Sequence, residues 1–105
     1  MKTITDGTQK QNDWANDIIR NPINSVEKRI AEWEHYIKLG YDDGYTTKII
    51  ASREAIAAYE SRLEEYGATL TAKFVIDQRD NFSRLMRSML CAAYKRAGLK
   101  VPANF

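Results

Sequence analysis

The fold is decided by residues 25–67, SVEKRIAEWEHYIKLGYDDGYTTKIIASREAIAAYESRLEEYG. Apolar side chains recur here every three or four residues on both sides of a polar turn, a spacing that places them on one face of an α-helix. Gly40 and Gly44 bound that turn and are typical of a helix end and a loop. The segment therefore predicts two antiparallel helices joined as a helix hairpin. The apolar stripes are Val26, Ile30, Trp33 and Ile37 in the first helix, and Ile49, Ile56, Tyr59, Leu63 and Tyr66 in the second.

A further helix is predicted before the hairpin. Thr8 and Gln11 have the spacing of a capping box, which predicts a helix that begins at Thr8. We expect it to end at Asn21, because the residue before a proline avoids the helical conformation. The first hairpin helix then begins near Asn24 or Ser25, both of which are good N-caps.

The chain after the hairpin is also expected to be helical. Thr46 or Thr47 is expected to cap the second hairpin helix, and Thr71 the next one. No Gly or Pro occurs between Thr71 and Gly98. This segment predicts either one long helix or two helices with a break near Asp80. The sequence therefore predicts an all-α fold, a small bundle of four to five helices in a single domain of residues 1–105.

Composition excludes several classes of function. A chain of 105 residues forms one modest core, so a deep ligand site would need a second subunit. Cys91 and His35 are the sole Cys and His, which excludes an internal disulfide and a zinc finger. With no catalytic motif, we expect a non-enzymatic protein without metal or cofactor. No apolar run suits a signal peptide or a membrane span, so we expect a soluble protein of the host-cell cytoplasm with no membrane partner.

Charge is unevenly distributed along the chain. The formal net charge is only +2, but residues 67–105 contain seven basic and two acidic residues, a net +5. Residues 25–66 contain six basic and nine acidic residues, a net −3. This asymmetry predicts an anionic partner near the C-terminal third. The alternative is that the basic end complements the acidic body within the fold or between subunits.

Helical spacing places most of these cations on one side of the last helix. Arg84 and Arg87 would form a ridge with Lys73, and such a ridge suits phosphate, because a guanidinium donates two parallel hydrogen bonds. The alternative is a solvated face held by salt bridges. Lys73 with Asp77, and Asp80 with Arg84, have the i,i+4 spacing of helical ion pairs.

Arg79 conflicts with a straight helix. It would point into the apolar side, beside Val75 and Phe82, and a buried guanidinium needs a partner. Either the helix breaks near Asp80, or Arg79 meets a carboxylate of another helix or an anionic ligand.

The aromatic residues divide into two groups. Trp14 and Trp33 fall on apolar stripes, which predicts core positions. Tyr41 and Tyr45 flank the polar turn, where an exposed ring suits stacking on a base; alternatively they pack over the end of the hairpin. The candidate ligand-binding residues are thus Lys73, Arg79, Arg84, Arg87, Tyr41 and Tyr45.

Two segments carry a resemblance. Gly7-Thr8-x-Lys10-Gln11-x-x-Trp14-Ala15, followed by Ile18, Ile19 and Arg20, resembles the opening of many small proteins of phages and bacterial mobile elements. Thr71-Ala72-Lys73-Phe74-x-Ile76-Asp77-x-Arg79 resembles a second motif of the same group. The resemblance implies a small accessory protein, for which counter-defence is an expectation by analogy.

We therefore expect a phage-type counter-defence binding protein. The function we favour is sequestration of a phosphorylated nucleotide signal in a pocket shared by the copies of a homo-oligomer. One alternative is a protein-directed inhibitor of a CRISPR effector or another host defence protein. The other is a nucleic-acid-binding accessory protein, in which the basic ridge lies on a phosphate backbone.

Overall fold

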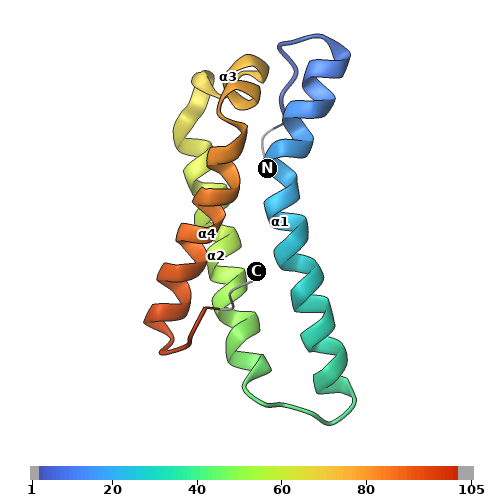
Figure 1. Cartoon of the computed structure of the whole chain (residues 1–105), viewed down its shortest axis with the longest axis vertical. Helices are drawn as coiled ribbons and strands as arrows, with labels where there is room; N and C mark the ends of the chain where they lie inside the picture. The colour runs from blue at the N-terminus through green and yellow to red at the C-terminus, as the bar shows by residue number, and fades with distance from the viewer. Residues whose placement is uncertain (1–2, 102–105) are drawn as a thin grey trace.

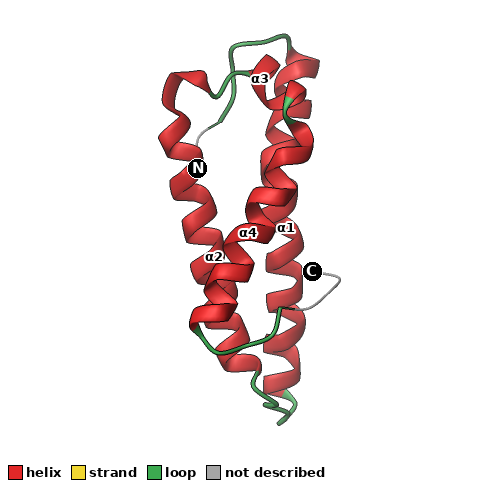
Figure 2. Cartoon of the chain, turned by 60° about the vertical axis from the view of Figure 1, so that its left-hand side comes forward, coloured by secondary structure: helices red, strands yellow, loops and turns green. Residues whose placement is uncertain are grey.

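The computed structural model describes residues 3–101 and is all-helical over that range, which confirms the predicted class. Three long helices run along the length of the molecule, and a short helix lies at one end (Figure 1). Figure 2 shows the same arrangement from the side, with no strand in the described part of the chain. The elements are α1 (Gln9–Lys38), α2 (Tyr45–Tyr66), the 3-10 turn η1 (Gly67–Thr69), α3 (Ala72–Asp77) and α4 (Arg79–Arg96).

The molecule is elongated, with extents of 48 × 25 × 21 Å. The loop of residues 39–44 joins α1 to α2 at one end of the long axis, and α3 lies at the other end (Figure 1). Helices α2 and α4 pack against each other, and both pack against α1. Within residues 3–101, no helix combines the length and the apolarity needed to cross a bilayer.

α1 is one continuous helix, so the prediction that a helix ends before Pro22 and a new one begins after it is wrong. Pro22 has no N–H and leaves the Ile18 carbonyl without its helical donor, a defect that costs about 3 kcal/mol in a helix interior. The Tyr59 hydroxyl on α2 donates a 2.7 Å hydrogen bond to the neighbouring Ile19 carbonyl. The ring of Pro22 is buried in the bundle. Tertiary packing and the Tyr59 hydrogen bond therefore keep α1 helical through Pro22.

The helical segment after Thr71 is divided into α3 and α4, the second of the two arrangements left open by the sequence. The break lies at Gln78, just before Asp80, where φ of −106° and ψ of 22° leave the α-helical range. Thr71 caps α3 as predicted, accepting a 3.1 Å hydrogen bond from the Phe74 N–H. The break turns Arg79 toward solvent, so its guanidinium does not have to enter the core.

Of the caps predicted for α1 and α2, the first is confirmed and the second is wrong. Thr8 and Gln11 form the predicted capping box at the start of α1. Neither Thr46 nor its neighbour Thr47 caps α2, because Gly44 occupies that position with a left-handed φ of 82°. The Asp42 carboxylate instead accepts hydrogen bonds from the backbone N–H and the hydroxyl of Thr46, at 3.3 and 3.0 Å.

One apolar core runs between the helices. Trp33 is 5% exposed and belongs to it, as predicted, but Trp14 is 49% exposed, so its predicted core position is wrong. Ala15 and Ile19 are the buried residues of this part of α1. Trp14 precedes Ala15 by one residue, about 100° around the axis, and therefore lies at the edge of the stripe.

A buried polar contact joins α2 to α4. The hydroxyls of Ser52 and Tyr94 lie 2.8 Å apart, and both side chains are fully buried. The Tyr94 oxygen also lies 3.5 Å from the Lys48 carbonyl. Burial raises the pKa of the Tyr94 hydroxyl, while the hydrogen bond to Ser52 acts in the opposite direction. The contact keeps two polar groups satisfied inside the core and fixes the register of the two helices.

Candidate functional site

The six candidate residues occupy different parts of the molecule. Lys73 lies on α3 and Arg79 begins α4, at one end of the long axis; Arg84 and Arg87 follow along α4. Tyr41 lies in the loop 39–44 and Tyr45 begins α2, at the opposite end (Figure 1). One subunit therefore does not bring the two tyrosines together with Lys73 and Arg79.

Lys73 is engaged by its own helix. Its ammonium lies 2.7 Å from the Asp77 carboxylate, the predicted i,i+4 pair. This hydrogen bond and the charge of Asp77 raise the pKa of the Lys73 amine. The pair is exposed, so it adds little stability and can reopen at small cost.

Arg79 joins the two segments that carry the resemblance. Its guanidinium donates a 2.9 Å hydrogen bond to the Ile76 carbonyl near the end of α3. It also lies over the indole of Trp14, 5.8 Å from the ring centroid, a cation–π distance. The Asp6 carboxylate, one residue before the first segment, accepts a 2.8 Å hydrogen bond from the Ala72 N–H of the second. These contacts support a structural role for Arg79 at the junction of α1 and α3.

Arg84, Arg87 and Lys95 form a row along α4, which we call the α4 cation row. Helical spacing places them within about 80° of arc and along about 16 Å of axis. Arg84 and Lys95 are exposed, and no ion pair within residues 3–101 involves either. The Asp80–Arg84 pair anticipated by the salt-bridge alternative is likewise absent from the described residues.

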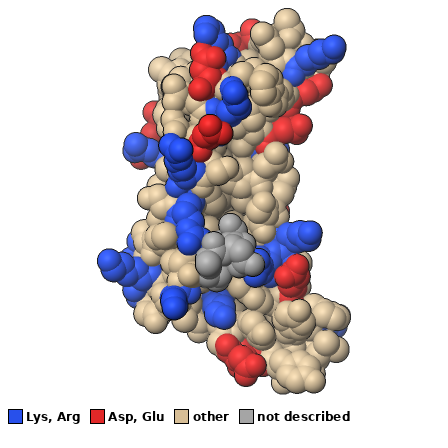
Figure 3. All heavy atoms as spheres, in the orientation of Figure 1, with Lys and Arg blue, Asp and Glu red and all other residues tan. Residues whose placement is uncertain are grey.

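The surroundings of the row are strongly positive. Residues 81–105 contain no acidic residue. Of the other cations on α4, Arg96 reaches across to Glu54 of α2 at 4.0 Å. In Figure 3, Lys and Arg side chains spread over the lower part of the α4 side with few acidic atoms among them. Such a surface attracts anions, phosphate groups above all.

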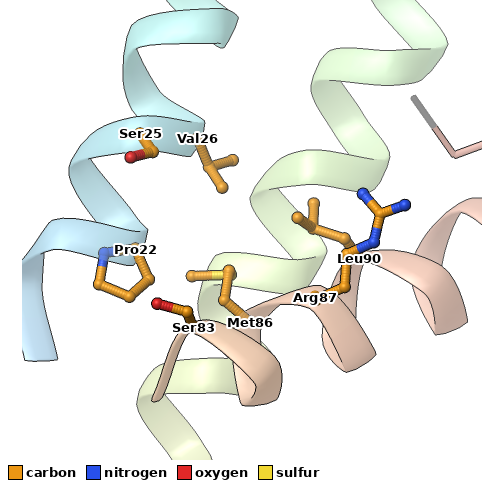
Figure 4. A pocket seen from close by; sticks show the side chains of 7 residues that line it. All are labelled: Pro22, Ser25, Val26, Ser83, Met86, Arg87 and Leu90. Atoms are coloured by element: carbon orange, nitrogen blue, oxygen red, sulfur yellow. The ribbon is translucent and has the colours of Figure 1, made fainter. Parts of the chain in front are cut away.

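A small pocket opens between α1 and α4, with a volume of about 110 Å³. The stem of Arg87 lies beside Leu90 at its edge, and the guanidinium points away from Pro22 (Figure 4). The volume is well below the roughly 300–1,000 Å³ of typical small-molecule sites. The pocket therefore suits a group the size of a phosphate and not a whole nucleotide. Its lining residues are Pro22, Ser25, Val26, Ser83, Met86, Arg87 and Leu90.

The two candidate tyrosines have different environments. Tyr45 is half-buried and lies against Trp33 and Tyr36, with ring centroids 6.4 and 5.5 Å away. The Lys48 ammonium lies 5.5 Å from the centroid of the Tyr45 ring. These contacts favour packing at the end of the α1–α2 pair over base stacking as the role of Tyr45. Tyr41 is 62% exposed and keeps its ring accessible.

Sequence reasoning missed the pocket and the stacking of Arg79 on Trp14. The pocket depends on α1 continuing past Pro22, which brings Ser25 opposite Ser83. The stacking depends on the turn at Gln78. Neither feature has a local pattern; the signal that was present was the conflict posed by Arg79 in a straight helix.

Two further results concern metal binding and similarity to known proteins. Within residues 3–101, no three His, Cys, Asp or Glu side chains gather where they could hold a metal ion. Comparisons with protein-family models, with curated proteins and with solved structures find no match to this chain.

Proposed function

We propose that this chain is a non-enzymatic binding protein that holds the phosphate groups of an anionic ligand on the α4 cation row. The observation that carries the proposal is the row itself: Arg84 and Lys95 are exposed without ion pairs among the described residues. The third member of the row, Arg87, lines a phosphate-sized pocket. Cations that the fold does not neutralise are available to a ligand from outside the subunit.

The favoured ligand is a phosphorylated nucleotide. A phosphate group seated beside Ser25 and Ser83 would receive hydroxyl hydrogen bonds, and the guanidinium of Arg87 would have to turn from its present direction to reach it. The rest of the ligand would remain outside the pocket, which is too small for it, along the surface toward Arg84. Binding would be shallow and largely electrostatic.

The biological role proposed is counter-defence. The resemblance of residues 7–20 and 71–79 to small phage proteins motivates a protein that removes a host nucleotide signal by binding it in a homo-oligomer. A second copy would be needed to add Tyr41 to the site, because the loop 39–44 and the start of α4 lie at opposite ends of one subunit.

Isothermal titration calorimetry against a panel of mono-, di- and cyclic nucleotides tests the ligand. We expect binding tighter than millimolar for at least one phosphorylated nucleotide and none for its nucleoside. Arg84→Ala combined with Lys95→Ala should weaken it at least tenfold. Arg62→Ala is the control, because Arg62 is also exposed and is already paired with Glu65 at 2.9 Å. If no nucleotide binds, or if the control weakens binding as much, the ligand assignment is wrong.

Nucleic-acid binding is the second candidate, because the row extends about 16 Å along one helix and could follow a phosphate backbone. Gel shifts with short single- and double-stranded DNA and RNA at two salt concentrations separate the two functions. Binding that falls steeply with salt and tightens with strand length supports the nucleic-acid function. Protein-directed inhibition of a defence effector predicts instead a stoichiometric protein complex that survives the loss of Arg84 and Lys95.

A further inference from the structure

An apolar groove of about 340 Å³ lies between α1 and α2, close to the loop 39–44. Most of its floor is aliphatic, and Ile50 on its edge is 55% exposed. An isoleucine this accessible on a regular helix leaves apolar surface in contact with water. The lining residues are Glu34, Ile37 and Lys38 of α1, and Thr46, Ile49 and Ile50 of α2.

The groove opens on the side of the α1–α2 pair that α4 does not cover. Ser52 faces α4, because its hydroxyl bonds the Tyr94 hydroxyl at 2.8 Å. Ile50 precedes Ser52 by two residues and therefore points about 200° away around α2. Helices α1 and α2 thus form a layer that α4 covers on one side. On the other side, no helix of the described chain packs against the groove.

The charges at the rim are self-complementary. Glu34 and Lys38 lie one helical turn apart on the α1 side of the groove. Arg53 of α2 forms an exposed ion pair with Glu34, at 3.4 Å. When two copies meet about a two-fold axis perpendicular to the helices, their α1 helices run antiparallel, and Lys38 of one copy can face Glu34 of the other. A rim with both signs thus suits a second copy of the same surface better than a partner of one net charge.

We propose that this groove is the interface between two copies of this chain. The two α1–α2 layers pack face to face about a two-fold axis, with Ile50 of each copy entering the groove of the other. The α4 helices then lie on the outer faces of the dimer, and both cation rows remain accessible. This dimer does not itself bring Tyr41 of one copy to the α4 cation row of the other. The inference rests on the self-association in the proposed function and not on its ligand, so the two can fail separately.

Light scattering coupled to size-exclusion chromatography tests the interface without any ligand. We expect a mass of twice 12.1 kDa for the full chain, falling on dilution, and a monomer for Ile50→Glu at the same concentration. Leu39→Glu is the matched control, because Leu39 is 58% exposed at the same end of the molecule. It points about 200° away from Ile37 and so lies off the groove.

Two results would overturn the interface. One is a full chain that stays monomeric at the highest concentration reached; the other is dissociation by Leu39→Glu as complete as that by Ile50→Glu. Circular dichroism establishes that both variants remain helical. Should Ile50→Glu unfold, Ile50→Gln is measured in its place, and we expect a weaker dimer with unchanged helicity. Calorimetry on the monomeric variant then shows whether nucleotide binding needs the dimer.

Discussion

Ser52 and Tyr94 show how a single buried hydrogen bond connects two helices. Tyr94→Phe removes the partner of the Ser52 hydroxyl on α4. Ser52→Ala removes the hydroxyl bonded to Tyr94 and leaves the Tyr94 contact with the Lys48 carbonyl in place. We expect each change to lower the free energy of unfolding by about 1–2 kcal/mol. The double variant should cost less than the sum of the two, because it removes both partners together. Urea denaturation of all four proteins measures the coupling; a coupling energy near zero would show that the contact contributes nothing.

The buried tyrosines also predict how stability depends on pH. Burial raises the pKa of the Tyr59 hydroxyl above its ordinary value, and burial does the same to Tyr94. Both stay protonated in the folded protein at a pH where the unfolded chain releases its protons, so folding opposes ionisation. Their contribution is complete below the unfolded pKa of about 10, and stability falls by up to about 1.4 kcal/mol per pH unit for each tyrosine above it.

Thermal unfolding between pH 8 and 11 at constant ionic strength checks this dependence. The Tyr59→Phe variant is less stable at neutral pH, because the hydrogen bond to Ile19 is lost, but its melting temperature should fall less steeply above pH 10. Parallel curves for the variant and the parent protein would exclude Tyr59 as a source of alkaline destabilisation.

At the scale of the helix, Pro22 determines the course of α1. Pro22→Ala restores an N–H that can bond the Ile18 carbonyl, a gain of about 3 kcal/mol for a helix interior, but removes part of a buried ring. We expect a net increase in the free energy of unfolding of about 1–2 kcal/mol, measured by urea denaturation. A decrease would mean that packing of the ring against its neighbours outweighs the restored bond.

The helices were largely predictable from sequence because their signals are local. Thr8, Thr71 and the apolar stripe through Trp33 are each recognised within one or two helical turns. The prediction at Pro22 was wrong because the tendency of a proline to end a helix is overridden here by burial of its ring and by the hydrogen bond from Tyr59, which is distant in the chain. Gln78 is not a helix breaker by type; the break there was inferable only from the cost of burying Arg79.

The candidate site was predictable only in part for the same reason. Helical spacing was sufficient to place Arg84 and Arg87 on one side of the last helix. It could not show that Arg79 stacks on Trp14 or that Tyr45 packs on Trp33, since both contacts depend on how separate helices meet. A pocket between α1 and α4 is likewise a property of the assembled bundle.

At the scale of the whole molecule, the two proposals occupy different faces. The cation row lies on α4, and the groove lies on the side of α2 that points away from α4. Ligand binding and self-association should therefore be separable by mutation. Ile50→Glu should leave the charge-dependent part of nucleotide binding intact, and loss of Arg84 and Lys95 should leave the dimer intact.

Self-association also links stability to protein concentration. When unfolding separates two copies, mass action stabilises the folded dimer by about 1.4 kcal/mol for each tenfold rise in concentration. For a chain of this length we expect the melting temperature to rise by about 3 °C per tenfold rise. Scanning calorimetry over a hundredfold range of concentration should show this rise for the parent protein and for Leu39→Glu, and a constant melting temperature for Ile50→Glu. A parent protein whose melting temperature does not change would show that the α1–α2 face stays uncovered in solution.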